Sequence, residues 1–280
     1  MTLTIEEVSE ASADKRIAAT YADIRTVQNL PIVNLIWRHL ATRPAALDWA
    51  WERARPIYAN GIAARESAAF RAALPIPQLP PLKVAIGEGL GLEASDRATI
   101  TAIIETYNRG NTLNLTALCA LLVTNRDEGK DRPIEPRSIA TPTEAPLSAI
   151  PSIPALSDLP PSVQRVIAEI NAFGIPDGES GFVASLYRHL GYWPSYLSFI
   201  YACLAPYAAS GELDKVVTGT RQAIAPYAAR AATQCKQVSP NSDTGFALDA
   251  IETFIRTAIC RMVPIGLMLG RALTSGDRTS

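Results

Sequence analysis

The chain has 280 residues, 48% of them hydrophobic, which is enough to bury one large core or two cores of ordinary size. Its formal net charge is −1 and it has no run of lysine or arginine, so it lacks the positive surface that nucleic-acid binding requires. Nucleic acid is therefore not an expected partner.

The N-terminus, residues 1–7, lacks the basic start and apolar core of a secretion signal. The most apolar run, 258–269, contains Arg261 and Pro264 and is shorter than the ~20 residues of a membrane span. A cytoplasmic protein without a membrane partner is expected. The four cysteines form no C-x-x-C pair, so we expect reduced thiols, no metal site and no cofactor.

Helical periodicity dominates the first part of the chain. It predicts an amphipathic helix over about 6–28, and a second helix that Pro31 opens and that reaches Arg43. Pro44 opens a third helix up to about Tyr58, and Gly61 precedes a fourth that ends near Leu74.

Beyond Leu74 the pattern changes several times. Four prolines between positions 75 and 81 predict a stiff connector, and eight more between 131 and 161 predict an extended linker. Further helices are expected at 82–90, 95–108 and 112–125, and a frayed tail at 274–280.

The segment 33–74 recurs without a gap at 183–224, a constant offset of 150 residues. The identical pairs include Arg38/Arg188, His39/His189, Pro44/Pro194, Pro56/Pro206 and Gly61/Gly211. A second block, 95–109, recurs at 242–256. So long a period indicates duplication of a whole domain. We predict an all-α fold with one helical copy in 1–130, the linker in 131–161 and a second copy in 162–273, related by a pseudo-twofold axis.

Two features could carry chemistry. His39 and His189 occupy equivalent places and could face each other; the favoured interpretation is a hydrogen bond near a helix end, and acid–base catalysis is the alternative. The stretch Asn108 to Asn111 interrupts an apolar run in the first copy alone. It either serves a task, because an amide can hold a water or a substrate oxygen, or breaks a helix.

A series of motifs occurs in order along about residues 15–270. They are Tyr21-Ala22-Asp23-Ile24-Arg25, Leu30-Pro31, Leu40-Ala41-Thr42-Arg43-Pro44, Leu79-Pro80-Pro81-Leu82, Tyr107-Asn108-Arg109-Gly110-Asn111 and Trp193-Pro194. In this series the chain resembles the group I 2-haloacid dehalogenases. The resemblance implies two repeats of an alkylhydroperoxidase D-like helical unit, an active site between them and a homodimer.

In that family an aspartate activates a water, an asparagine positions it, and the water attacks the halogen-bearing carbon of a small 2-haloacid. The resemblance places the asparagine on Asn111 and the pocket serine on Ser185. It places the aspartate on Leu186, and two aromatic pocket residues on Ile32 and Leu35. A leucine cannot accept a proton, and removing a positioned base costs roughly 10²–10⁴ in rate.

Asp177, Glu179 or Glu105 could supply another carboxylate, although the first two also suit a solvated turn and the third recurs as Glu252. Two hypotheses remain. The first is a 2-haloacid hydrolase, which requires a carboxylate near Asn111. The second is a non-dehalogenating relative that binds or converts a small apolar molecule in an aliphatic cleft. In both, the partner is a small molecule, and a carboxylic acid is one candidate.

Overall fold

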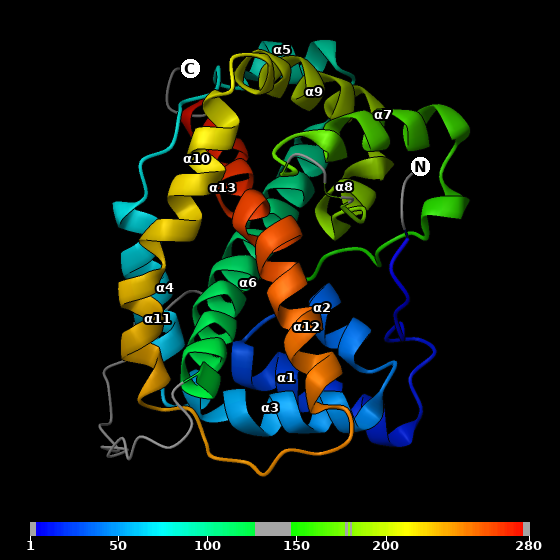
Figure 1. Ribbon diagram of the computed structural model, residues 1–280. Coiled ribbons are helices and arrows are strands. Elements are labelled where there is room, and N and C mark those ends of the chain that lie inside the picture. The colour runs from blue at the N-terminus through cyan, green and yellow to red at the C-terminus, as the bar shows by residue number, and fades with distance from the viewer. Residues whose placement is uncertain (1–3, 127–146, 177–178, 180, 277–280) are drawn as a thin grey trace.

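The computed structural model describes residues 4–126, 147–176, 179 and 181–276. Within these residues the secondary structure is helical and no β-sheet forms, which confirms the all-α prediction (Figure 1).

Six helices lie in the first part of the chain. They are α1 (Lys15–Gln28), α2 (Leu35–Leu40), α3 (Pro44–Ala59), α4 (Ile62–Ala73), α5 (Val84–Gly89) and α6 (Ala94–Arg126).

The second part begins with the short turn η1 (Leu156–Asp158). It continues with α7 (Pro161–Ala172), α8 (Ser185–His189), η2 (Leu190–Tyr192), α9 (Pro194–Ala209), α10 (Glu212–Ala223), α11 (Ala225–Ala232), α12 (Thr244–Phe254), the π-helical turn η3 (Ile255–Ile259) and α13 (Cys260–Gly276). Helix α13 therefore extends into the predicted tail, and the part of the linker at 131–146 lies outside the described residues.

Two pairs of helices have equivalent bounds. Helices α9 and α10 begin and end 150 residues after α3 and α4. Gly61 and Gly211, which precede α4 and α10, both adopt left-handed backbone angles, with φ of 82° and 71°. A glycine is favoured at both positions because it lacks the Cβ that strains this conformation. These matches support the duplication, which stays a prediction.

Two predicted helix starts are wrong. The first helix begins at Lys15 rather than near residue 6, because the Asp14 side chain accepts a hydrogen bond from the Ile17 N–H and caps it there. The second begins at Leu35, so Pro31 lies in the bend that precedes α2 rather than in its first turn. The predicted boundaries at Pro44 and Gly61 are confirmed.

The predicted break at Asn108–Asn111 is also wrong, because α6 is one continuous helix of 33 residues. Gly110 is tolerated inside it because the Asn34 side chain packs directly on the glycine, where a Cβ would come within 2.9 Å of both amide atoms. Asn108 donates to the Gly266 carbonyl at 3.0 Å, and Asn114 donates to the Gly110 carbonyl at 2.8 Å. Contacts with residues outside α6, namely Gly266 for Asn108 and Asn34 for Gly110, thus accommodate residues that would otherwise favour a helix end.

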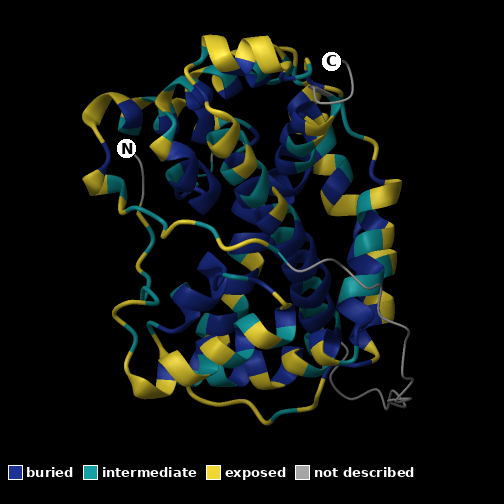
Figure 2. Cartoon of the chain, turned by 180° about the vertical axis from the view of Figure 1, so that it is seen from behind, coloured by how far each residue is buried: buried dark blue, intermediate teal, exposed yellow. Residues whose placement is uncertain are grey.

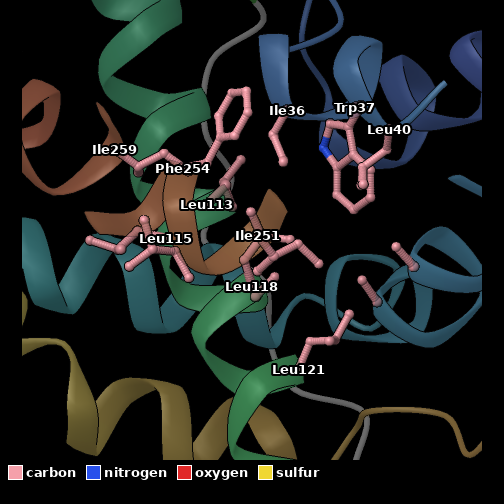
Figure 3. Close-up of a cluster of buried hydrophobic side chains, with 14 of the residues drawn as sticks. Ile36, Trp37, Leu40, Leu113, Leu115, Leu118, Leu121, Ile251, Phe254 and Ile259 are labelled. Carbon is pink, nitrogen blue, oxygen red and sulfur yellow. The ribbon is translucent and has the colours of Figure 1, made fainter. Parts of the chain in front are cut away.

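Helix α6 and the continuous α12–η3–α13 segment run side by side through the centre of the molecule in opposite directions (Figure 1). Their buried residues divide between two hydrophobic clusters. The N-terminal part of α6, with Ile100 and Ile104, packs with α7 to α9 and α13. Helix α12, with Ile251 and Phe254, packs with α1 to α3 and the C-terminal part of α6 (Figure 3). Each cluster therefore contains a helix from the other half of the sequence.

The central helices are buried and the outer ones expose one face (Figure 2). The segment Thr244–Ser275 is long and apolar enough to cross a membrane, but 78% of its most apolar window is buried inside the fold. Burial of that extent is typical of a core helix in a soluble protein.

Candidate small-molecule site

A small cavity lies where α2, α6, α8 and the α12–η3–α13 segment meet. Its volume is about 50 Å³, more than the ~10–15 Å³ that one water needs. Most of its wall is apolar. The apolar lining consists of Leu35, Ile36, Phe182, Ala184, Leu186, Phe254, Ala258, Ile259 and Met262.

Five polar side chains complete the wall: Asn34, Tyr107, Asn111, Asn114 and Ser185. A mostly apolar wall with a few polar groups is the usual composition of a small-molecule site.

The structure brings together four of the five residues that the resemblance placed in the site. Asn111, Leu35, Ser185 and Leu186 all line the cavity. Ile32 does not line it and is buried in the hydrophobic cluster around α7 to α9. The functional roles of the four remain predictions.

Asn111 and Asn114 lie about one turn apart on α6 but differ in their partners. The Asn114 Oδ1 accepts from Trp37 Nε1 and the Tyr58 hydroxyl, both at 2.9 Å, and from Gln28 Nε2 at 3.3 Å. Asn111 is half-buried and lines the cavity. Asn114 is therefore part of the framework, whereas Asn111 is available to a ligand.

Asn34 is another polar residue of the cavity wall. The Oδ1 of Asn34 is buried and accepts no hydrogen bond within the described structure. A buried acceptor without a partner costs about 1–3 kcal/mol.

Ser185 connects the cavity to a group of buried charges. Its Oγ accepts a hydrogen bond of 3.2 Å from the Arg38 guanidinium, and Arg38 binds the Glu7 carboxylate at 2.9 Å. Arg188 binds the same carboxylate, also at 2.9 Å. Two guanidinium groups thus share one carboxylate, so the region behind Ser185 carries a net positive charge.

Tyr107 of the cavity wall forms a polar pair with His189, which lies behind it. The His189 Nε2 lies 2.8 Å from the Pro151 carbonyl, which can only accept, so this nitrogen carries the proton. Nδ1 then accepts from the Tyr107 hydroxyl at 3.4 Å. Burial lowers the pKa of His189 to about 4 and raises that of Tyr107. Both groups are therefore neutral near pH 7, and the Tyr107 oxygen is left as an acceptor.

Arg261 positions the wall segment from Phe182 to Ser185. This arginine is fully buried and donates to the Asn171 side chain at 2.8 Å and to the Asn171 and Phe182 carbonyls at 3.0 and 3.3 Å. The Asn171 amide in turn donates to the Phe182 carbonyl and accepts from the Ala184 N–H. Burial lowers the pKa of Arg261.

No described residue of the cavity wall is acidic. The Glu179 side chain pairs with Arg256. Glu105 is 60% exposed, lies 4.0 Å from Arg109 and lines a different surface hollow. Asp177 lies outside the described residues. The described structure therefore places none of the three candidate carboxylates beside Asn111.

The cavity also contains residues that the sequence did not single out. Phe254, Ala258 and Ile259 come from the end of α12 and the turn η3, where the wider π-helical winding lies in the cavity wall. Such turns often mark functional sites. No short-range sequence pattern indicated this one.

The two histidines make the hydrogen bonds that the favoured interpretation expected. His39 Nδ1 lies 2.7 Å from the Glu6 carbonyl and its ring packs on Phe246 and Phe254, whereas His189 contacts Tyr107. The four cysteines are free, and the described residues contain no cluster of three or more His, Cys, Asp or Glu that could hold a metal ion.

The structure is similar to solved structures of D-2-haloacid dehalogenase. One is a mutant in complex with D-2-CPA, with 18% sequence identity, 98% of each chain covered and a TM-score of 0.76. Another is a complex with L-LA, with 17% identity, the same coverage and a TM-score of 0.76. No family model and no curated protein matches the sequence. At this identity the likeness establishes the fold, so the chain has a 2-haloacid dehalogenase-like fold.

Proposed function

We propose that the cavity binds one small molecule with an apolar body and a polar end, and that the protein is a relative of the 2-haloacid dehalogenases that does not dehalogenate. The main support is the position of Leu186, which lies in the cavity wall and is 1% exposed. A hydrolytic dehalogenase needs a base for its water, and none of the described wall residues is a carboxylate.

The polar end of the ligand would lie against Asn34, Asn111 and Ser185, and its apolar body against Leu186, Phe254 and Met262. Asn111 supplies both a donor and an acceptor, and Ser185 is polarised by Arg38 behind it. A carboxylic acid is one candidate for the polar end, because the charges behind Ser185 are positive in sum.

Ligand binding can be tested with two probes of similar size, propionate and 1-propanol, by ligand-observed NMR. Ala258→Phe is the matched control, because its larger side chain fills the cavity from η3. Binding to the wild type that Ala258→Phe abolishes supports the proposal. Equal signals for both proteins, or none for either probe, would contradict it.

The second candidate is a 2-haloacid hydrolase, and the shared fold favours it. Chloride release from both enantiomers of 2-chloropropionate distinguishes the two. We expect none from the wild type and a measurable rate from Leu186→Asp at alkaline pH, where a carboxyl group with a raised pKa ionises. Leu186→Asn is the control of matched shape. Chloride release by the wild type that Asn111→Ala removes would establish hydrolysis and overturn our proposal.

A further inference from the structure

A second, larger hollow of about 400 Å³ lies beside the cavity and opens to the surface. We call it the outer hollow. The N-terminal residues Thr4, Ile5 and Glu7 line one side of it, and Leu156 and Gln164 line another. Leu35, Val183 and Arg188 complete the wall that faces the cavity.

The partition between the two spaces is one side chain thick. Leu35 lines both of them. Val183 faces the outer hollow, while its neighbours Phe182 and Ala184 line the cavity. Residues 182–184 are not helical, and in an extended chain successive side chains point to opposite sides.

Most residues of the cavity wall are buried. Thirteen of its fourteen wall residues are at most 9% exposed, Asn111 being the exception. The surface hollow that contains Glu88, Arg97 and Glu105 shares no residue with the cavity. Leu35 is the one residue that lines both the cavity and the outer hollow, so its side chain lies between the two spaces.

The charges at the outer hollow favour one type of ligand. Arg188 lines it and shares the Glu7 carboxylate with the buried Arg38, which leaves a net charge of about +1 in this group. Charge of one sign in a concave site raises the local concentration of ions of the opposite sign.

We propose that the outer hollow is the access route to the cavity, that Leu35 is the side chain that moves aside, and that the route favours anions over cations. The inference rests on the proposed function in one respect, namely that the cavity receives a ligand. Access itself can be measured without knowing that ligand.

The experiment uses a cysteine in the cavity as a reporter. Leu186→Cys is made in the full chain together with Cys119→Ser and Cys203→Ser, which remove the two half-buried thiols. The neutral reagent methyl methanethiosulfonate is added, and the rate of modification of the residue-186 peptide is followed by mass spectrometry. Val183→Cys provides a second reporter, in the outer hollow.

We expect Leu35→Ala to raise the modification rate at position 186 by about tenfold and Leu35→Trp to lower it by about tenfold, changes that correspond to ~1.4 kcal/mol in the barrier. The reporter at position 183 should respond to neither change. Leu40→Ala is the control for lost packing, because Leu40 is fully buried on the same helix but lines neither space. An unchanged rate in Leu35→Trp, or an equal increase in Leu40→Ala, would overturn the route.

The charge preference is tested with the anionic 2-sulfonatoethyl and the cationic 2-aminoethyl methanethiosulfonates. At low salt we expect the anion to react faster at position 186, and Arg188→Gln to reduce the anion-to-cation ratio several-fold. Arg271→Gln, an exposed arginine of α13, should leave the ratio unchanged. If the cationic reagent modifies position 186 faster than the anionic reagent in the protein with Arg188 unchanged, the proposed charge preference is refuted.

The failure of either proposal can be recognised separately. If neither propionate nor 1-propanol binds while the rates at position 186 still depend on Leu35, the binding function fails and the route stands. If a probe binds while the modification rate at position 186 does not change on substitution of Leu35, the access route is refuted and the binding function is retained.

Discussion

Arg38 and Arg188 bind the two oxygens of one carboxylate, that of Glu7, at 2.9 Å each. The two arginines lie 150 residues apart, on helices α2 and α8. A single residue of the N-terminal segment therefore joins the two sides of the cavity.

Replacement of Glu7 should destabilise the protein. Glu7→Gln keeps the shape but leaves two largely buried guanidinium groups without a counter-charge, and we expect a loss of about 2–4 kcal/mol in the free energy of unfolding. Urea denaturation measures it. Glu6→Gln is the matched control at an exposed position and should change stability by less than ~0.5 kcal/mol. Similar values for the two variants would show that the shared carboxylate contributes little.

The stability of the protein should fall in acid partly because of His189. Its pKa is about 4 in the folded chain, against about 6.5 when unfolded. Between these values the unfolded chain binds a proton that the folded chain does not, so the free energy of unfolding decreases as the pH falls from 6.5 to 4. We expect this group to account for roughly 2–3 kcal/mol.

The measurement compares wild type with His189→Gln, which can keep the donor to the Pro151 carbonyl, by urea denaturation from pH 7.5 to pH 4. Carboxylates such as Asp23, whose pKa is lowered by its hydrogen bond to Arg55, also lose stabilisation in acid, but they do so in both proteins. The difference between the two proteins should shrink as the pH falls. A constant difference would contradict the assignment.

Asn111 and Asn114 provide a matched pair on one helix. Asn114→Leu leaves the Trp37 and Tyr58 donors unpaired in the interior, so it should cost about 3–5 kcal/mol. Asn111→Leu removes an amide of the cavity wall and should change stability by less than ~1 kcal/mol while weakening probe binding. Thermal or urea unfolding and the NMR binding measurement test both statements. A large stability loss in Asn111→Leu would indicate a framework role instead.

Arg261 should act as a positioning residue for the cavity wall. Arg261→Met fills a similar volume but removes the donors to Asn171 and Phe182, and hydrogen bonds from a charged group are worth about 1.5–3 kcal/mol each. Because removing a buried charge offsets part of this loss, we expect a net destabilisation of about 2–4 kcal/mol. Arg271→Met, exposed on the same helix, should be nearly neutral. If the reporter at position 186 is modified faster in Arg261→Met, Arg261 positions the cavity wall. If the modification rate is unchanged, Arg261 contributes to stability alone.

Local sequence signals were sufficient where a helix boundary depends on one residue. Pro44 and Gly61 predicted the bounds of α3 and α4 because a proline fits the first helical turn and a glycine accepts a left-handed conformation. Local sequence signals failed at Asn108–Asn111. There the helix continues because Gly110 packs against Asn34 and Asn108 donates to Gly266, two residues far away in the sequence.

The candidate site was predictable in part for a related reason. The family resemblance placed Leu35, Asn111, Ser185 and Leu186 in one pocket, and the structure brings them together. The charges behind Ser185 were not predictable, because the Glu7 and Arg188 side chains are 181 residues apart and neither position has an unusual local pattern. The Arg261–Asn171 contact spans 90 residues and was missed for the same reason.

The exchange of helices between the two hydrophobic clusters has a consequence for the integrity of the molecule. Neither half of the sequence can complete its own interior, because Ile100 and Ile104 belong to the cluster of the later helices and Ile251 and Phe254 to that of the earlier ones. If the chain is cut between the two halves of the sequence, each fragment still supplies a helix to the hydrophobic cluster of the other fragment. We therefore expect the two fragments of a proteolytically cleaved chain to stay associated until the protein is denatured.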